Sequence, residues 1–352
     1  MLTEKQIKEI REHLEKAQNP VFFFDNDIDG LSSFLLLCRY IERGKGVVIR
    51  SYPDLNAGYF RKINELNPDY VFILDKPQVS KEFIDEVKSK NLPIVWIDHH
   101  GVDVDKGILE GIFYYNPNFN EDKTSEPVSY LCYQVSNKKE DLWISLMGCI
   151  GDAFMPDFFN ESLKRYPEVL ETDKEIKEPF DVYYNTKIGE IARVLNFALK
   201  DRISNVVQMM KFLLKVKQPN EILEENYKTR QILRRYKQLK LKYDKFLSKA
   251  KSFINENKIV FFQYGGEFSL SADIANELFY SYPDKIIVVA YLKGTKANIS
   301  LRGKIDIRKA TVEAIKGLEN ATGGGHKHAT GATIFIEDLD KFKENLRKAV
   351  EE

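Results

Sequence analysis

The chain has 352 residues, which at about 150 residues per domain is long enough for two or three domains and excludes a single small one. Lysine plus arginine and aspartate plus glutamate total 53 each, so net charge indicates no partner and only the distribution of charge is informative. Three cysteines without C-x-x-C spacing argue against a disulfide framework and a zinc ribbon, and favour the cytoplasm. The sequence has no signal peptide and no apolar run of about 18 residues, so we expect a soluble protein with no membrane partner.

Apolar strands and amphipathic helices alternate along the N-terminal half. We expect strands over 21–24, 46–51, 70–74 and 92–97, and helices over 4–16, 31–40, 57–67 and 81–89. This alternation predicts βαβ units and a mostly parallel sheet. In such sheets, ligands bind outside the carboxyl ends of the strands.

Acidic residues and histidines follow three of these strands. Asp25, Asp27 and Asp29 come after the first strand, Asp75 after the third, and Asp-His-His at 98–100 after the fourth. In an extended segment the first three carboxylates point to one side, where they repel one another unless a cation neutralises them. Each motif alone has a structural alternative, either a solvated acidic turn or partly buried histidines bonded to a strand-end carbonyl. Their convergence on one sheet edge favours a functional site.

Asp152 follows an apolar helix expected over 141–150, after another helix expected over 124–134. A helix dipole disfavours an acid at the C-terminal end, so this position favours a metal ligand over an ordinary acid. Five or six carboxylates with one or two histidines describe a dinuclear site for Mn²⁺ or Mg²⁺, with Asp75 as the natural bridging ligand. Two such ions suit phosphoester hydrolysis.

The middle of the chain predicts a polar loop or insertion over 161–190 and two helices, over 191–217 and 219–255. Apolar side chains in the second helix have the spacing of a seam that packs within the chain or against a second copy, as in a homodimer: Ile232, Tyr236, Leu239, Tyr243 and Phe246. Residues 227–251 carry ten lysines or arginines and one acid. This stretch is either a solvated connector or a track for a phosphate backbone.

A second α/β pattern begins at Lys258. We expect strands over 259–263, 286–291, 297–302 and 332–336, and helices over 272–280 and 308–318. Three consecutive glycines, 323–325, let the backbone approach an anion as phosphate-binding nests do, and Arg302 and His326 add charged donors. The alternative is an ordinary flexible turn.

The ordered set of motifs resembles the DHH phosphoesterase superfamily over nearly the whole chain: D-x-D-x-D-G at 25–30, the lone Asp75, D-H-H at 98–100, Asp152, and G-G-G-H at 323–326. The resemblance implies an α/β protein with a mostly parallel DHH catalytic domain at 1–160 and a helical linker at 161–256. A smaller DHH-associated nucleotide-binding domain follows at 257–352, with the active-site cleft between the two α/β domains.

The resemblance also implies residue roles. Two Mn²⁺ or Mg²⁺ ions are expected at Asp25, Asp27, Asp29, Asp75, His99 and Asp152. His100 is expected to contact the scissile phosphate. The other expected catalytic residues are Asp98, Arg302 and His326. Arg302 and the loop of Gly323, Gly324, Gly325 and His326 are expected to grip a nucleotide. Asp25 stands where many members have histidine, a difference that bacterial RecJ proteins share.

Within the superfamily the chain most resembles the archaeal RecJ-like nucleases. This implies an exonuclease releasing mononucleotides from single-stranded DNA or RNA or from short oligonucleotides, in the 3′ to 5′ direction, with DNA repair as its setting. One alternative is an oligoribonuclease, phosphoadenosine phosphatase or cyclic-dinucleotide phosphodiesterase. Another is a non-enzymatic scaffold that binds replication or repair proteins. The intact set of acids and histidines favours catalysis.

Overall fold

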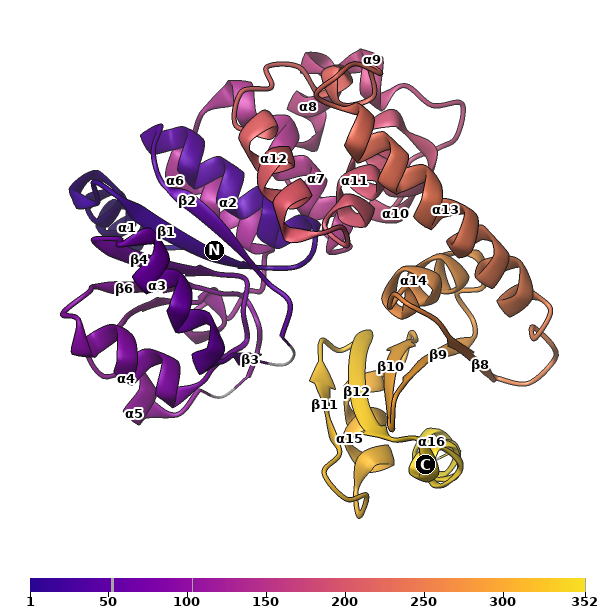
Figure 1. The fold of residues 1–352 in the computed structure, drawn as a ribbon. Coiled ribbons are helices and arrows are strands. Elements are labelled where there is room, and N and C mark those ends of the chain that lie inside the picture. The colour runs from indigo at the N-terminus through magenta and orange to yellow at the C-terminus, as the bar shows by residue number, and fades with distance from the viewer. Residues whose placement is uncertain (52–53, 103, 352) are drawn as a thin grey trace. The chain divides into compact units, whose positions relative to one another are not determined.

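The computed structural model describes residues 1–51, 54–102 and 104–351, so residue 352, the expected end of the last domain, lies outside them. The chain divides into two compact units, unit 1 at 1–236 and unit 2 at 237–352 (Figure 1). The helices after residue 161 and before residue 236 therefore belong to unit 1. The boundaries of the expected three-part division stay a prediction.

A five-stranded parallel sheet forms the centre of unit 1. Its strands run in the order β2-β1-β4-β6-β7. They are β1 (Pro20–Asp25), β2 (Lys45–Ile49), β4 (Tyr70–Leu74), β6 (Ile94–Ile97) and β7 (Phe113–Tyr115), and a separate short pair joins β3 (Asp54–Leu55) to β5 (Gln78–Val79). The predicted parallel sheet is confirmed, and β7 is a strand that the pattern did not predict.

Helices cover both faces of this sheet because consecutive residues of each strand are apolar and point to opposite faces. Val21 and Phe23 of β1 belong to the core formed with α3 (Phe60–Leu66) and α4 (Lys81–Ser89). On the other face, Phe22 and Phe24 lie with ring centroids 5.8 and 5.1 Å from that of Phe34 in α2 (Ile28–Ile41). α6 (Val128–Ser136), α7 (Leu142–Gly151) and the N-terminal α1 (Glu4–Lys16) pack on the α2 side, and the short α5 spans Lys106–Leu109.

The helical region after α7 differs from the prediction in three places. The expected loop over 161–190 contains α8 (Phe159–Arg165), α9 (Pro167–Leu170) and α10 (Pro179–Asn185). The expected helix over 191–217 is two helices, α11 (Lys187–Ala198) and α12 (Ile203–Leu213), because the chain turns extended at Arg202. Pro219 opens only a 3₁₀ turn (Pro219–Ile222), so the long helix α13 begins at Arg230 and ends at Lys251.

The apolar seam of α13 packs within the chain. Ile232, Tyr236, Leu239 and Tyr243 are buried. The ring centroids of Tyr236 and Phe197 lie 5.8 Å apart in unit 1, and those of Phe246 and Tyr264 lie 4.5 Å apart in unit 2. The seam is therefore occupied within the chain and does not offer a surface to a second copy. Dimerisation through another surface stays a prediction.

Unit 2 is a mixed sheet with helices on both faces. Its strands run in the order β11-β12-β10-β9-β8, with only β8 and β9 parallel. They are β8 (Ile259–Gly265), β9 (Ile286–Lys293), β10 (Lys296–Arg302), β11 (Thr322–Gly325) and β12 (Ala329–Phe335). α15 (Ile307–Ile315) and α16 (Leu339–Glu351) share one core with the sheet, and α14 (Ser271–Ser281) packs on β9 and β10. β11 and α16 were not predicted.

Among the described residues, no helix combines the length and the apolar character that crossing a bilayer requires.

Candidate metal centre

Three candidate acids leave the sheet at the same level. Phe24, Leu74 and Ile97 are register partners on β1, β4 and β6. The next residue on each strand is an aspartate: Asp25, Asp75 and Asp98. Parallel pairing therefore brings together carboxylates that the sequence separates by up to 73 positions.

Asp27 and Asp29 reach the site through α2, which starts three residues earlier than expected. Asp27 is the N-cap of α2, and its Oδ1 accepts from the backbone N–H of Gly30 at 2.9 Å. Asp29 lies in the first turn rather than in an extended segment, because this cap already turns the chain into a helix. Its two carboxylate oxygens accept from the backbone N–H groups of Val128 and Ser129 at 2.8 and 2.9 Å. The N-terminus of α6 thus fixes this buried carboxylate.

Asp75 occupies an unusual backbone conformation at the end of β4. Its φ is +57°, in the left-handed region, and its N–H donates to the carbonyl of Ile97 at 3.0 Å. Left-handed backbone is uncommon for a residue with a side chain, and such conformations concentrate at functional sites. The turn leaves the side chain of Asp75 buried next to β6.

The orientation of His99 points to a cation. Its Nδ1 lies 3.3 Å from the carbonyl oxygen of Ser125, which can only accept, so Nδ1 carries the proton. Nε2 then lies 3.4 Å from Asp75 Oδ1 and 3.3 Å from Asp152 Oδ2. A neutral imidazole would place a lone pair against two carboxylates. The arrangement is favourable when a metal ion or a second proton lies among these atoms.

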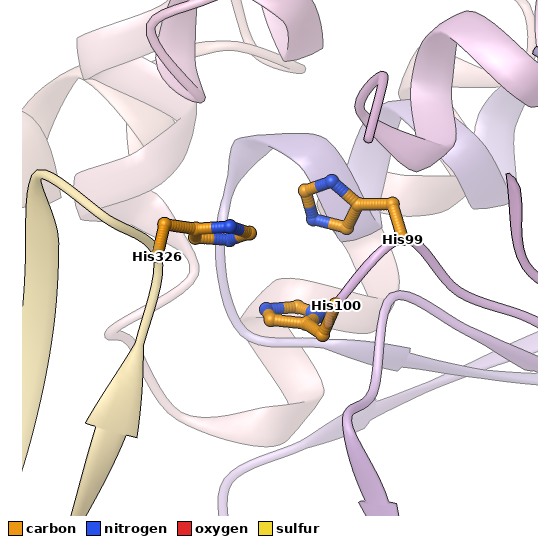
Figure 2. A group of neighbouring side chains, drawn as sticks. All are labelled: His99, His100 and His326. Carbon is orange, nitrogen blue, oxygen red and sulfur yellow. The ribbon is translucent and has the colours of Figure 1, made fainter. Parts of the chain in front are cut away.

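The side chain of His100 is held by the carboxylate of Asp98, whereas that of His99 is held by a backbone carbonyl. Its Nδ1 lies 2.8 Å from Asp98 Oδ1, and its backbone N–H donates to Asp98 Oδ2 at 3.1 Å. Figure 2 shows the rings of His99 and His100 edge to face after β6, with centroids 4.5 Å apart. His326, also labelled there, follows β11 in unit 2. Asp98 thus holds the imidazole of His100 through Nδ1.

Two groups of side chains in unit 1 offer ligand atoms within 4.8 Å of one another. The first contains Asp29, His99 and Asp152, and the second contains Asp75, Asp98 and His100. Asp152 is the C-cap of α7, as the sequence predicted. Asp25 and Asp27 belong to neither group, but Asp25 raises the pKa of Asp27, and Asp27 raises that of Asp75.

Without a metal ion, burial and mutual repulsion raise the pKa values of three acids in the site. Burial, then repulsion from Asp25 and Asp152, raises the pKa of Asp27 to about 7. Burial, then Asp152, raises the pKa of Asp29 to about 6, and burial with Asp27 holds the pKa of Asp75 well above its usual value. Burial and neighbouring carboxylates raise these values because charge is costly without a partner. Oxygen-rich donors with one or two imidazoles fit Mn²⁺ or Mg²⁺.

The pKa values of the two histidines are also raised, but by attraction to the acids and against the effect of burial. Burial alone would lower the pKa of His99, but the attraction of Asp152, Asp29 and Asp98 outweighs it and the pKa lies above the usual value. The pKa of His100 is likewise raised, since attraction to Asp98 exceeds the effect of burial. For Asp98, burial acts to raise the pKa, yet His100 outweighs it and the pKa falls below its usual value. Asp98 and His100 thus form an ion pair at the edge of the acid cluster.

Sequence reasoning missed three residues that shape the site. Lys76 is 1% exposed, and its Nζ donates to Asp25 Oδ1 at 2.9 Å and to the carbonyl of Ser51 at 3.0 Å. The amide of Asn116 donates to the carbonyl of His100 at 2.9 Å and lies 3.4 Å from Asp98 Oδ2. A Cβ at Gly148 would lie 3.0 Å from Asp29 Oδ1. Only the lysine gave a usable signal, as a positive charge beside the aspartate that ends an apolar strand.

The candidates in unit 2 lie on and beside its sheet. Arg302 ends β10, its Nε donates to Asn276 Oδ1 at 2.5 Å, and its Nη1 donates to the carbonyl of Leu301 at 2.8 Å. The glycines 323–325 form the edge strand β11 with Thr322, paired antiparallel with β12. The alternative of an ordinary flexible turn is therefore wrong, because β12 supplies hydrogen-bond partners along these glycines. Binding of a phosphate or nucleotide there stays a prediction.

Comparisons with known proteins agree with this description. Residues 242–352 match the DHHA1 domain family. A crystal structure of RecJ with Mn²⁺ from Thermus thermophilus is similar at 15% identity and a TM-score of 0.71, over 99% of this chain and 54% of that one. The DHH domain of a member of a family of ribosomal proteins has 16% identity and a TM-score of 0.66, over 98% and 89% of the two chains. An exonuclease RecJ bound to manganese has 15% identity and a TM-score of 0.62, over 98% and 94%.

No curated protein sequence matches the chain. The chain spans about half the length of the Thermus RecJ that it resembles. Its fold is that of the RecJ exonucleases over nearly its whole length. The expected DHH-associated domain agrees with the family match over 242–352, and the expected fold agrees with the RecJ structures.

Proposed function

We propose that the chain is a metal-dependent phosphodiesterase, a RecJ-like exonuclease that releases mononucleotides from single-stranded DNA or RNA or from short oligonucleotides, in the 3′ to 5′ direction. The observation that carries this proposal is the buried cluster in which His99 Nε2 lies between Asp75 and Asp152. A merely structural cluster would pair its acids with cations of the protein. Here most of the acids raise one another's pKa instead.

Two divalent cations, Mn²⁺ or Mg²⁺, would be held by Asp25, Asp27, Asp29, Asp75, His99 and Asp152. When bound, such ions supply Lewis acidity and positive charge for the attacking and leaving oxygens of a phosphoryl displacement. The Thermus RecJ and the manganese-bound RecJ that the fold resembles carry such ions. The number of ions in this chain is part of the proposal.

The protein's own groups divide the remaining work. Asp98 holds Nδ1 of His100 at 2.8 Å, so a protonated His100 directs its Nε2–H away from Asp98. That N–H suits a phosphate oxygen, because a charge-assisted hydrogen bond stabilises the negative charge that develops there. Asn116 supports the pair by donating to the carbonyl of His100. Arg302, held by Asn276, would contribute to nucleotide binding from unit 2.

The exposed face of α13 favours a polymeric substrate over a small one. Arg234, Lys237, Lys240, Lys245 and Lys249 are all exposed on it. Beside the second half of α13, a hollow in unit 2 is lined by Lys242, Phe246, Glu267 and Phe268. The ammonium of Lys242 lies 3.3 Å from a carboxylate oxygen of Glu267 and 5.3 Å from the centre of the Phe268 ring. Lysines beside aromatic rings suit the backbone and bases of a single strand.

Neutralising the charges on this face of α13 distinguishes a polymeric substrate from a small nucleotide. The variant R234Q/K237Q/K240Q removes three exposed charges. Arg235 is left unchanged because its Nη2 donates to the carbonyl of Lys200 and supports the fold. We expect binding of a long strand to weaken by roughly tenfold or more and to lose salt dependence, since each phosphate contact releases counterions. Hydrolysis of a dinucleotide should change by less than about twofold, because one linkage cannot span the helix face.

A matched control carries K5Q/K8Q/K81Q, three exposed lysines on α1 and α4. This control should retain strand affinity and salt dependence. If the α13 variant and the control bind long strands equally well, the exposed face of α13 does not bind a polymer. A recycling enzyme for dinucleotides or phosphoadenosine phosphate then becomes the better proposal.

A further inference from the structure

Lys76 is a fully buried lysine inside the acid cluster. It directly follows Asp75, and its ammonium makes two hydrogen bonds, one with Asp25 Oδ1 and one with the carbonyl of Ser51. The Asp25 side chain is 29% exposed, whereas Lys76 is 1% exposed. Burying an ammonium costs several kcal/mol unless close partners compensate, so such a residue is retained for packing or for charge.

The backbone of Lys76 is anchored as firmly as its ammonium. The indole Nε1 of Trp96, a buried residue of β6, donates to the carbonyl of Lys76 at 2.9 Å. Asp75, the residue before, is tied to Ile97 of the same strand. Lys76 therefore spans from β4 to the ends of β1 and β2 in a geometry that leaves its charge little freedom.

That charge takes part of the role of a metal ion. Asp25 is the one expected ligand that pairs with a lysine among the described contacts, and it belongs to neither of the two close ligand groups in unit 1. The other acids of the cluster repel one another. A fixed positive charge beside Asp25 lowers the net negative charge of the site and opposes the entry of a divalent cation.

We propose that Lys76 is a built-in counter-ion and positioning residue: it occupies one oxygen of Asp25, neutralises that acid and limits the affinity of the site for divalent cations. The proposal rests on the proposed metal site and extends it to the residue that sets the strength of cation binding. It assigns Asp25 a shared role, paired with Lys76 through Oδ1 and able to face a cation only through Oδ2.

The test measures Mn²⁺ affinity rather than catalysis, by isothermal titration calorimetry on the full chain. We expect K76M to bind Mn²⁺ about tenfold tighter than the wild type, because a repelling charge is lost and Asp25 is released. The charge-retaining K76R should stay within about threefold of the wild type. In a D25N background, K76M should still tighten Mn²⁺ binding, but by less than in the wild type, because only the repelling charge is removed and no carboxylate is released.

Each outcome separates the proposals. If the wild type binds no Mn²⁺ at all, the proposed metal site fails. If it binds Mn²⁺ but K76M has the same or weaker affinity, only the counter-ion role of Lys76 fails. Should K76M not fold, D25N/K76M replaces both members of the pair with neutral groups and D25N alone leaves Lys76 unpaired. The proposal then requires D25N to bind Mn²⁺ more weakly than the double variant, and equal affinities would contradict it.

Discussion

At the scale of single residues, the candidate site depends on Asp75. It lies in left-handed backbone between β1 and β6 and faces Nε2 of His99 at 3.4 Å. We expect D75N to reduce Mn²⁺-dependent hydrolysis by at least about 100-fold, since loss of even an outer partner of a metal site costs roughly 10 to 100-fold. The measurement is initial rate on a labelled oligonucleotide. D85N, on the surface of α4, is the control that should keep full activity.

Protonation of the same cluster gives a signed prediction for stability. The pKa of Asp27 rises from 3.8 to about 7 on folding, and that of Asp29 from 3.8 to about 6, chiefly because of burial. Between the pKa of the unfolded chain, 3.8, and the raised pKa values of the folded protein, the folded metal-free protein binds more protons than the unfolded chain. Its free energy of unfolding should therefore fall as pH rises from about 4 to 7.

Mn²⁺ should reverse this trend, because it binds the ionised carboxylates and competes with protons. The melting temperature should thus increase more on adding Mn²⁺ at pH 7.5 than at pH 5, measured by differential scanning calorimetry. D27N should flatten the pH dependence of the metal-free protein. A metal-free protein whose stability rises over this range would show that the acids are paired in some other way.

At the scale of elements, the contact between α2 and the end of β1 decides where three acids lie. A Cβ on Gly30 would come within 2.5 Å of the carbonyl oxygen and 2.8 Å of the nitrogen of Asp25. Because both atoms belong to backbone, G30A should displace α2 and cost about 1 to 3 kcal/mol of unfolding free energy by the usual cost of overpacking. Mn²⁺ affinity should fall with it.

Urea denaturation and Mn²⁺ titration measure the two effects of G30A. G107A, in the exposed α5, is the matched control because a Cβ there meets only Asp105 Oδ1 at 3.4 Å. If G30A has the stability and metal affinity of G107A, the close packing of α2 on β1 is not what positions the site.

Elements with strong periodicity or apolar runs were predictable, and weaker ones were not. The strands β1, β4 and β6 and the helices α1 and α4 follow from local pattern, and with them the meeting of Asp25, Asp75 and Asp98. The edge strand of glycines, β11, has no apolar alternation and depends on pairing with β12. Lys76 and Asn116 were missed as site residues because their roles come from tertiary contacts rather than from spacing.

At the scale of the whole molecule, the two compact units predict separable unfolding. Each has its own sheet and its own buried core. Since the candidate ligands at 25–29, 75, 99 and 152 all lie in unit 1, Mn²⁺ should raise only one of two calorimetric transitions. At 100 times the dissociation constant the gain is about 2.7 kcal/mol. A single transition that shifts as a whole would mean that the units unfold as one.

Metal-dependent cleavage of single strands is tested most directly by one time course. Single-stranded DNA and RNA labelled at the 5′ or the 3′ end are incubated with Mn²⁺ and either the wild type or D75N, with dinucleotides and phosphoadenosine phosphate alongside. We predict a ladder of 5′-labelled strands shortening from the 3′ end, mononucleotide products, and no ladder with D75N. Equal cleavage by D75N, or no cleavage of any strand or small nucleotide by the wild type, would contradict metal-dependent hydrolysis at this site.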